Sequence, residues 1–217
     1  MRRLLGVAVS LVMVGAVGCG DATTTTSTTP TATPVLLTLD DLDAGWRAGP
    51  ETGEADLVDL ATAIRMPCPD VGINPTIATR LAPSAAVQFE SADGTSRHLI
   101  ESVTIGDPGR LGLDVEVWIG GLDACVARGA NPDEGLVRFE RMTLPALGDQ
   151  RAAFLQVATE EPGSPPYWWM RTAIVRVDRV LLIVGVIEVV DAEGAQPTFD
   201  DAAFVDLVTG AVGLVRP

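Results

Sequence analysis

The chain has no lysine and only one histidine, His98, among its 217 residues. All of its basic side chains are therefore arginines, and 15 of them stand against 29 acidic residues, which gives a net charge of −14. A chain this negative is not expected to bind nucleic acids or anionic lipid surfaces through charge. A single histidine also leaves little basis for histidine-dependent catalysis, and no Gly-x-Ser-x-Gly motif is present to supply a nucleophile.

Other patterns of catalytic and metal-binding proteins are missing as well. The sequence has no Gly-x-x-x-x-Gly-Lys loop for phosphate groups. Acidic residues gather between positions 40 and 59, but residues 41–45 lack the further ligands of a calcium-binding loop. We interpret these carboxylates as side chains at helix starts and on a solvated face. We interpret His98 as a solvated residue at the edge of a strand. We expect no catalytic residues, no metal site and no cofactor.

Only three cysteines are present, and the first of them, Cys19, closes an N-terminal targeting pattern. A basic start over residues 1–3 precedes an apolar run over residues 4–17, and Gly18 stands directly before the cysteine. This order is typical of a bacterial lipoprotein signal peptide. We expect residues 1–18 to be removed and Cys19 to carry the lipid that anchors the protein to the outer face of the cell membrane.

Two alternatives to this targeting prediction are open. One is an uncleaved membrane anchor, which is less favoured because the apolar run of 14 residues is shorter than the roughly 20 residues that a spanning helix needs. The other is cleavage and secretion without a lipid.

Residues 19–34 are dominated by threonine and proline and contain no apolar cluster that could form a core. We predict a disordered tether, which is also a typical target of O-glycosylation. The remaining residues, 35–217, are enough for one domain with its own core.

Two cysteines, Cys68 and Cys125, remain in this domain. Outside the cytoplasm an isolated pair is most often a disulfide. Its loop of about 57 residues would stabilise the fold by about 4 kcal/mol in the chain-entropy model. A redox pair is the alternative, although such pairs are typical of a Cys-x-x-Cys motif.

The apolar pattern of residues 35–217 predicts a single α+β domain, an antiparallel sheet flanked by helices. Strands are expected over residues 87–90, 99–105, 136–144, 151–158, 168–177 and 180–190. The last of these is almost wholly apolar, as in a central strand that is covered on both faces. A tight turn at Asp178-Arg179 joins it to the strand before.

Shorter helical segments are expected near both ends of the domain. Thr38 and Asp41 have the spacing of a capping box for a short helical turn. A helix is predicted over residues 55–65, where apolar residues recur on one face. The last helix is predicted to begin with Thr198 as its N-cap.

A long helix is predicted between Asp107-Pro108, an N-cap followed by proline, and Gly129, a typical stop. Its apolar residues recur at helical spacing and include Trp118 and Cys125, so both are expected on the buried face. The expected disulfide would then join this helix to the segment around Cys68.

Three consecutive aromatic residues, Tyr167, Trp168 and Trp169, follow a proline-rich segment that we expect to be an exposed loop. Consecutive side chains of a strand point to opposite faces, so the two tryptophans are expected to diverge. At least one of them is a candidate to line a cleft or a docking surface. The alternative places one tryptophan in the core and the other over a rim.

The order of several segments also carries a family resemblance. They are the stretch over residues 36–42, the Cys68 segment, the strand over 102–105 that leads into a helix ending near Cys125, Gly148-Asp149 before a strand, the hairpin over 176–184 and the terminal helix. In this order the chain resembles the PknH-like extracellular sensor domains of actinobacterial membrane serine/threonine kinases and the lipoproteins related to them. The resemblance implies a sheet flanked by helices, with an apolar cleft for an extracellular ligand. Members usually have two disulfides and a glycine in the hairpin turn, whereas this chain can form one disulfide and has Asp178-Arg179 at the turn.

We therefore predict a cell-surface lipoprotein whose sensor-like domain binds an apolar or amphipathic envelope molecule in a cleft. The candidates for the lining of this cleft are Trp118, Tyr167, Trp168 and Trp169. The alternative is a module that docks onto another envelope protein through residues 162–169. An enzyme is the least favoured class, because no nucleophile and base form a convincing pair. The predicted partners are thus the membrane, through lipidated Cys19, and a small apolar ligand or an envelope protein.

Overall fold

The structure, a computed structural model, describes residues 35–49 and 80–215, with short gaps at residues 132, 134, 160, 163 and 192–194. All described residues belong to one compact unit, which spans Thr33–Pro217. Five sequence predictions lie outside the described residues and stay predictions: the signal peptide, the lipidated Cys19, the tether, the helix over residues 55–65 and the position of Cys68.

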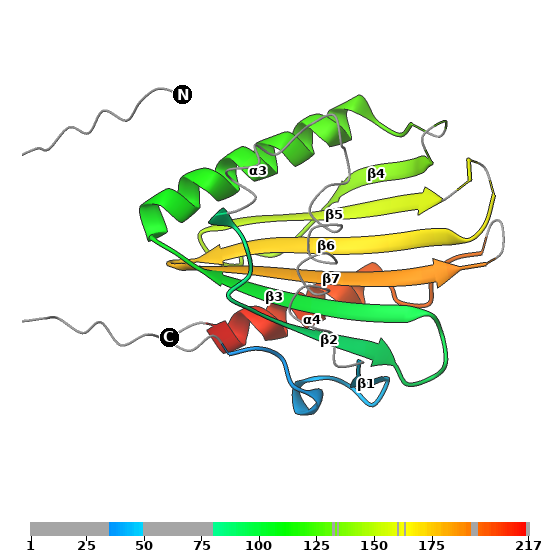
Figure 1. The fold of residues 1–217 in the computed structure, drawn as a ribbon, viewed down its shortest axis with the longest axis horizontal. Coiled ribbons are helices and arrows are strands. Elements are labelled where there is room, and N and C mark those ends of the chain that lie inside the picture. Colours follow the sequence, from blue (N-terminus) through cyan, green and yellow to red (C-terminus); the bar gives the residue numbers. More distant parts are fainter. Residues whose placement is uncertain are drawn as a thin grey trace, which may run out of the picture. The chain divides into compact units, whose positions relative to one another are not determined.

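Seven antiparallel strands form one sheet in the order β1-β2-β3-β7-β6-β5-β4 (Figure 1). They are β1 Trp46–Ala48, β2 Ala85–Ser91, β3 Arg97–Ile105, β4 Leu136–Met142, β5 Gln150–Thr159, β6 Tyr167–Val177 and β7 Val180–Val190. With the helices described below, they make the α+β fold that the sequence predicts. The predicted central strand over residues 180–190 is confirmed, because β7 lies in the middle of the sheet and all of its residues from 181 to 188 are buried.

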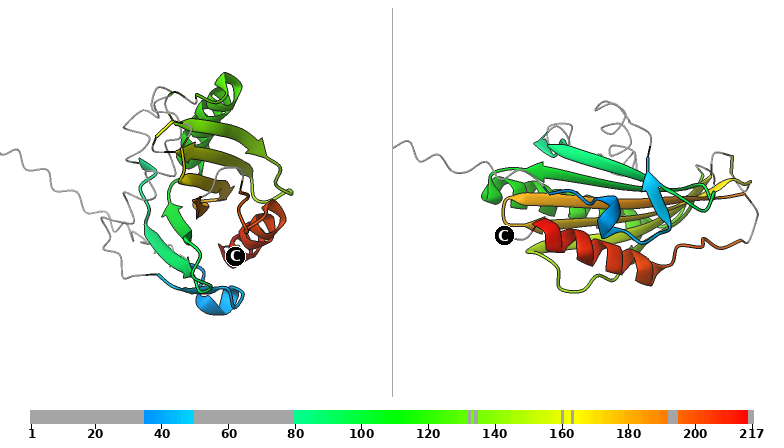
Figure 2. Two further views of the ribbon diagram at one scale, coloured as in Figure 1. Left: turned by 90° about the vertical axis from the view of Figure 1, so that its right-hand side faces the viewer. Right: turned by 90° about the horizontal axis from the view of Figure 1, so that it is seen from below.

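Two helices cover opposite faces of the sheet, as Figure 2 shows: α3, Pro108–Arg128, and α4, Asp201–Val215. Side chains alternate along a strand, so each long strand contributes to two cores. On β3, Leu99 and Val103 pack in the core under α4, whereas Ile100 packs in the core under α3. No helix among the described residues combines the length and the apolar character that crossing a bilayer requires.

Both predicted ends of α3 are confirmed. The Asp107 carboxylate accepts a hydrogen bond from the backbone N–H of Arg110 at 2.9 Å, and Pro108 occupies the first turn. Gly129 ends the helix with a φ of +84°, a conformation that glycine adopts without a steric penalty. The short helical turn near the N-terminal end is confirmed too, as the 3₁₀ helix η1, Leu39–Asp41, whose Asp41 carboxylate accepts from Thr38 N–H at 2.8 Å.

The predicted start of the last helix is wrong. Helix α4 begins at Asp201, and the Asp200 carboxylate, not the Thr198 hydroxyl, accepts from an N–H of the first turn, that of Ala203 at 2.8 Å. Thr198 is held elsewhere: its N–H and its hydroxyl both donate to Glu188, at 2.7 and 2.8 Å. A buried carboxylate on β7 therefore keeps the chain out of the helix until Asp201.

The two edge strands are short or irregular. Strand β1 has three residues, and β4 has a register shift between Leu136 and Arg138 in its pairing with β5. Strand β4 also carries charged side chains, among them Glu140 and Arg141. Such features oppose pairing of an edge with another strand.

The hairpin between β6 and β7 turns without a glycine. Asp178 adopts a φ of +52°, and its N–H donates to the Asp149 carboxylate at 2.7 Å. Asp149 in turn donates its own N–H to the Arg176 carbonyl at 2.7 Å. Gly148, with a φ of +62°, makes this close approach possible, because a Cβ there would lie 2.3 Å from the Arg176 carbonyl oxygen.

We expect Gly148→Ala to lower the free energy of unfolding by about 2 kcal/mol or more, because the added Cβ strains the backbone and meets another backbone atom. Gly94→Ala is the matched control, since Gly94 also has a positive φ, +82°, but a Cβ there meets nothing within 4 Å. The control should lose only about 1 kcal/mol. Urea unfolding of the two variants measures the difference, and equal losses would contradict the assigned contact.

Candidate functional site

A hollow, which we call the α4 groove, lies between the segment over residues 37–46 and helix α4. Its volume is about 420 Å³, and it is lined by Leu37, Asp41, Leu42, Asp43, Trp46, Phe199, Ala203, Asp206, Leu207, Gly210 and Leu214. This volume is within the range of small-molecule sites in proteins, about 300–1,000 Å³.

The helical side of the groove follows from the sequence of α4. Its lining residues are spaced three or four positions apart, from Ala203 through Leu207 and Gly210 to Leu214, so they share one face of the helix. Gly210 leaves room in the middle of this stripe, since a Cβ there would meet nothing within 4 Å. The opposite side comes from η1, β1 and the residues around them.

The groove is apolar within and acidic at its rim. Trp46 and Phe199 are both buried and meet edge to face, with ring centroids 5.9 Å apart. The acidic side chains are Asp41, Asp43 and Asp206. The arrangement can hold an apolar body and offers hydrogen-bond acceptors and negative charge to the end of a ligand that stays near solvent.

Buried polar groups fix the aromatic wall. The Arg97 guanidinium lies over the rings of Trp46 and Phe199, with its central carbon 5.0 and 5.5 Å from their centroids. Such placement of a cation over aromatic faces is attractive. On the neighbouring strand, the Glu188 carboxylate accepts from Phe199 N–H at 3.0 Å. The two aromatic rings are therefore held in place by residues on the two central strands of the sheet.

A second buried carboxylate holds the other wall. Glu101 is fully buried on β3 and accepts a hydrogen bond from the backbone N–H of Leu37 at 2.6 Å, while its Oε1 atom has no hydrogen-bond partner. Burial raises the pKa of Glu101 to about 7; the bond from Leu37 opposes this shift, and the negative charge of Asp41 adds to it. This carboxyl therefore titrates near neutral pH while it holds a lining residue of the groove.

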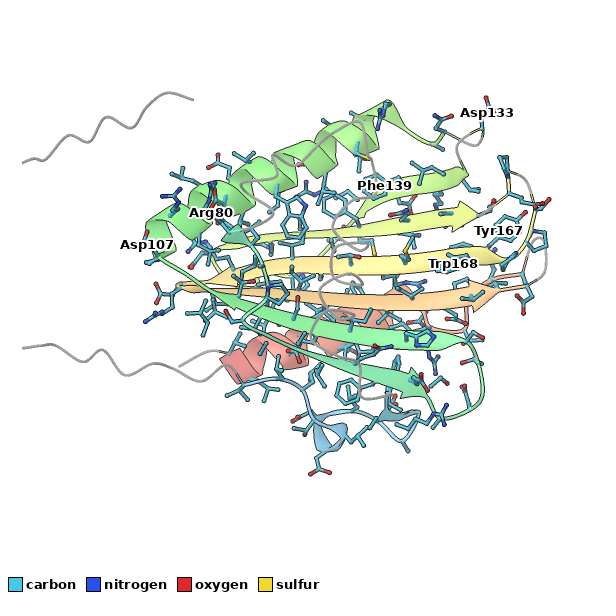
Figure 3. The ribbon with its side chains drawn as sticks, viewed as in Figure 1. Arg80, Asp107, Asp133, Phe139, Tyr167 and Trp168 are labelled. Atoms are coloured by element: carbon cyan, nitrogen blue, oxygen red, sulfur yellow. The ribbon has the colours of Figure 1, made fainter. Side chains whose placement is uncertain are left out.

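The structure does not bring the four predicted lining residues together. Tyr167 and Trp168 lie at the start of β6, at one end of the sheet (Figure 3). Trp168 is 36% exposed, and Trp169 points to the opposite face, where it lines a second pocket near the start of α4. Trp118 is 1% exposed and packs in the core under α3. Its expected burial is confirmed, and it is a packing residue because the apolar stripe of α3 faces the sheet.

The residues that do line the α4 groove were missed by sequence reasoning. Trp46 carries only a weak signal, an aromatic residue after Gly45 close to a capping box. Phe199 lies in the stretch that the sequence assigns to the last helix. Their contact joins positions 153 residues apart, and no local pattern reports such a contact.

The other predicted residues are placed as follows. Cys125 is fully buried and disulfide-bonded, and Cys68 as its partner stays a prediction. His98 lies within β3, half-buried and paired with Glu90 and Ile187, so it is not at a strand edge. Its Nδ1 lies 3.5 Å from Nε2 of Gln88. In the described part of the chain, no three His, Cys, Asp or Glu side chains are grouped for metal binding.

Comparison with known proteins finds only weak similarity. No protein-family model matches the sequence, and no curated protein matches it. Among solved structures, the chain is similar to the Ran-binding protein Mog1p of Saccharomyces cerevisiae, with a TM-score of 0.35 and 13% identity, over 62% of this chain and 79% of that one. A mutant of Mog1 gives a TM-score of 0.37 and 12% identity, over 61% and 79%. Similarity at this level assigns neither a family nor a function.

The titration of Glu101 predicts a pH-dependent stability. Between its ordinary pKa of 4.5 and its folded-state pKa of about 7, the folded chain binds more protons at this site than the unfolded chain. The stabilising contribution of the protonated carboxyl is therefore complete below about pH 4.5 and is lost as the pH rises through 7. Glu101→Gln keeps an oxygen for Leu37 N–H and does not ionise.

From pH 4.5 to pH 8, we expect the free energy of unfolding of Glu101→Gln to rise relative to the wild type by about 3 kcal/mol. Urea unfolding of both proteins across this range measures the difference, in which the titration of all other groups cancels. Two parallel pH profiles would show that the pKa of Glu101 is the same in the folded and in the unfolded protein.

Proposed function

We propose that the chain is a non-catalytic binding domain of the cell envelope, anchored by a lipid on Cys19, that holds an apolar or amphipathic molecule in the α4 groove. The observation that carries the proposal is the groove itself, about 420 Å³ with an aromatic and aliphatic interior and three carboxylates among its lining residues. The N-terminal targeting pattern supports a position outside the cytoplasm.

The chemistry of the groove narrows the class of ligand. An apolar body gains from contact with Leu42, Leu207 and Leu214, which line the groove and are only partly buried. These side chains pack against the buried cluster that contains Leu37, Trp46 and Phe199. Asp41, Asp43 and Asp206 favour a head group that is cationic or that donates hydrogen bonds, and they disfavour an anionic one. We therefore expect a neutral or cationic amphipathic molecule.

The walls of the groove are held by hydrogen bonds to buried carboxylates. Leu37 is fixed through Glu101, and Phe199 is fixed through Glu188. Walls that are already ordered lose little conformational freedom when a ligand enters, which favours affinity. This rigidity supports a binding site more than it supports a site that must move during catalysis.

Docking onto another envelope protein is the second candidate function. One observation favours it: Trp168, directly after the loop that precedes β6, is 36% exposed. Exposed tryptophan is enriched in protein interfaces. This surface lies apart from the α4 groove, because none of the three consecutive aromatic residues lines that groove.

Gly210→Phe tests the ligand-binding proposal, because its side chain would fill the groove from the helix. The matched control is Gly213→Phe, at an exposed position of the same helix that does not line the groove and where a Cβ also meets nothing within 4 Å. Both changes remove a helical glycine and should not destabilise α4. We expect Gly210→Phe to weaken binding of the neutral apolar dye Nile red at least about tenfold and Gly213→Phe to leave it unchanged.

Fluorescence titration of the unit Thr33–Pro217 measures the dye affinity. Native mass spectrometry of the full chain and its variants, purified from membranes, reports molecules retained from the cell envelope. A molecule that is retained by the wild type and by Gly213→Phe, but not by Gly210→Phe, would be the ligand of the α4 groove. Equal dye binding in all three proteins would contradict a site in the groove. A wild type that carries no molecule and binds no dye would favour docking instead.

A further inference from the structure

A second pocket, which we call the Arg171 pocket, opens on the same face of the sheet as the α4 groove. Its volume is about 480 Å³, and its wall includes Arg138, Trp169 and Arg171 from the sheet and Asp200 and Asp201 from the start of α4. It shares no lining residue with the α4 groove. The two hollows are therefore separate candidates for ligands.

The most unusual group in this pocket is the Arg171 guanidinium. Its side chain is only 4% exposed, and its Nε donates to the Asp201 carboxylate at 2.8 Å. Its Nη1 atom is buried and has no hydrogen-bond partner. A buried charged donor without a protein acceptor is rare in folded proteins, and an acceptor from a ligand or from an ordered water would complete its hydrogen bonds.

Further groups around Arg171 suit an anionic ligand. Arg138, which is 48% exposed, pairs with Glu140 through Nε and Nη2, at 2.9 and 2.5 Å. Helix α4 begins at the pocket, and the N–H groups of a first helical turn have no partner within the helix. The Asp200 carboxylate takes one of these, that of Ala203.

The charges of the pocket limit the ligand to a single negative charge. Arg138 and Arg171 are balanced by Asp200 and Asp201 among the lining residues, and Glu140, which pairs with Arg138, adds a third carboxylate beside them. Asp201 is 63% exposed, so water screens its charge more than it screens the buried Arg171. A monoanion therefore meets less repulsion from these three carboxylates than a phosphate dianion would.

The body of the ligand has a place beside this anionic group. Trp169 is half-buried in the pocket wall and offers a flat apolar face, and Leu155, also in the wall, lies opposite Arg171 on the neighbouring strand. We propose that the Arg171 pocket binds a carboxylate attached to an aromatic or other apolar group, with the carboxylate on Nη1 of Arg171 and the apolar part against Trp169. This site is separate from the α4 groove and takes an anionic ligand, whereas the ligand proposed for the α4 groove is neutral or cationic.

Calorimetric titration of the full chain in phosphatidylcholine nanodiscs tests the proposal, with empty nanodiscs as the blank. The probes are 3-phenylpropionate and its uncharged counterpart 3-phenylpropan-1-ol. We expect the wild type to bind the carboxylate at least about tenfold more tightly than the alcohol, and Arg171→Gln to lose this preference. Because Arg171 is buried, Arg138→Gln and Asp201→Asn, both at exposed positions, provide tests that do not depend on how Arg171→Gln folds.

We expect Arg138→Gln to weaken carboxylate binding several-fold, because it removes an attractive charge. We expect Asp201→Asn to strengthen it several-fold, because it removes a repulsive charge. Asp206→Asn removes the same charge from an exposed position of α4 in the other hollow and should have no effect. A wild type that binds both probes equally would overturn the proposal. A carboxylate affinity that changes with Asp206→Asn or Gly210→Phe, but not with Asp201→Asn, would also overturn the proposal. These results do not depend on whether the α4 groove binds a ligand.

Discussion

The carboxylate of Glu188 determines how one whole face of the sheet is organised. It is buried on the central strand and accepts three hydrogen bonds, two from Thr198 and one from Phe199. These bonds hold the bend at Thr198 and Phe199 against the sheet, place Phe199 in the α4 groove and let α4 begin where Asp201 meets Arg171. Removal of one partner of a buried charge typically destabilises a protein by about 3–5 kcal/mol. The groove, the helix start and the Arg171 pocket therefore depend on the same contact.

Two kinds of chemistry result on this face. Where the chain passes over Glu188, Phe199 faces the α4 groove, whose rim is acidic, while Asp200 and Asp201 line the pocket that contains Arg171. Both hollows lie over a sheet whose central strand, β7, is buried on both faces from residue 181 to residue 188, so the polar groups between them are buried and must be paired. Arg97 meets this need in part, with Thr198 at 3.3 Å and with two aromatic rings, while its Nε atom has no hydrogen-bond partner. Arg171 also meets it only in part.

The sequence predicted what depends on local pattern and missed what depends on distant partners. The bounds of β7 and both ends of α3 follow from an apolar run and from caps at Asp107 and Gly129, and the structure confirms them. The start of α4 was wrong because Thr198, a good N-cap by type, is taken by Glu188 across the sheet. The α4 groove was not found because its walls come from opposite ends of the domain. The aromatic residues after the proline-rich loop were predicted to line a cleft because of their composition. Side chains alternate along β6, however, so consecutive residues lie on different faces of the sheet.

The irregular edges of the sheet bear on how copies of this protein can coexist. A lipid on Cys19 would confine many copies to two dimensions, at a far higher local concentration than in solution, with their sheets free to meet. Strand addition needs a long, flat and uncharged edge, and among the described residues one edge strand is only three residues long while the other is broken in register and carries Arg138, Glu140 and Arg141. The short β1 and the irregular, charged β4 therefore oppose edge-to-edge association of crowded copies. The two ligand-sized hollows then stay available on each separate molecule.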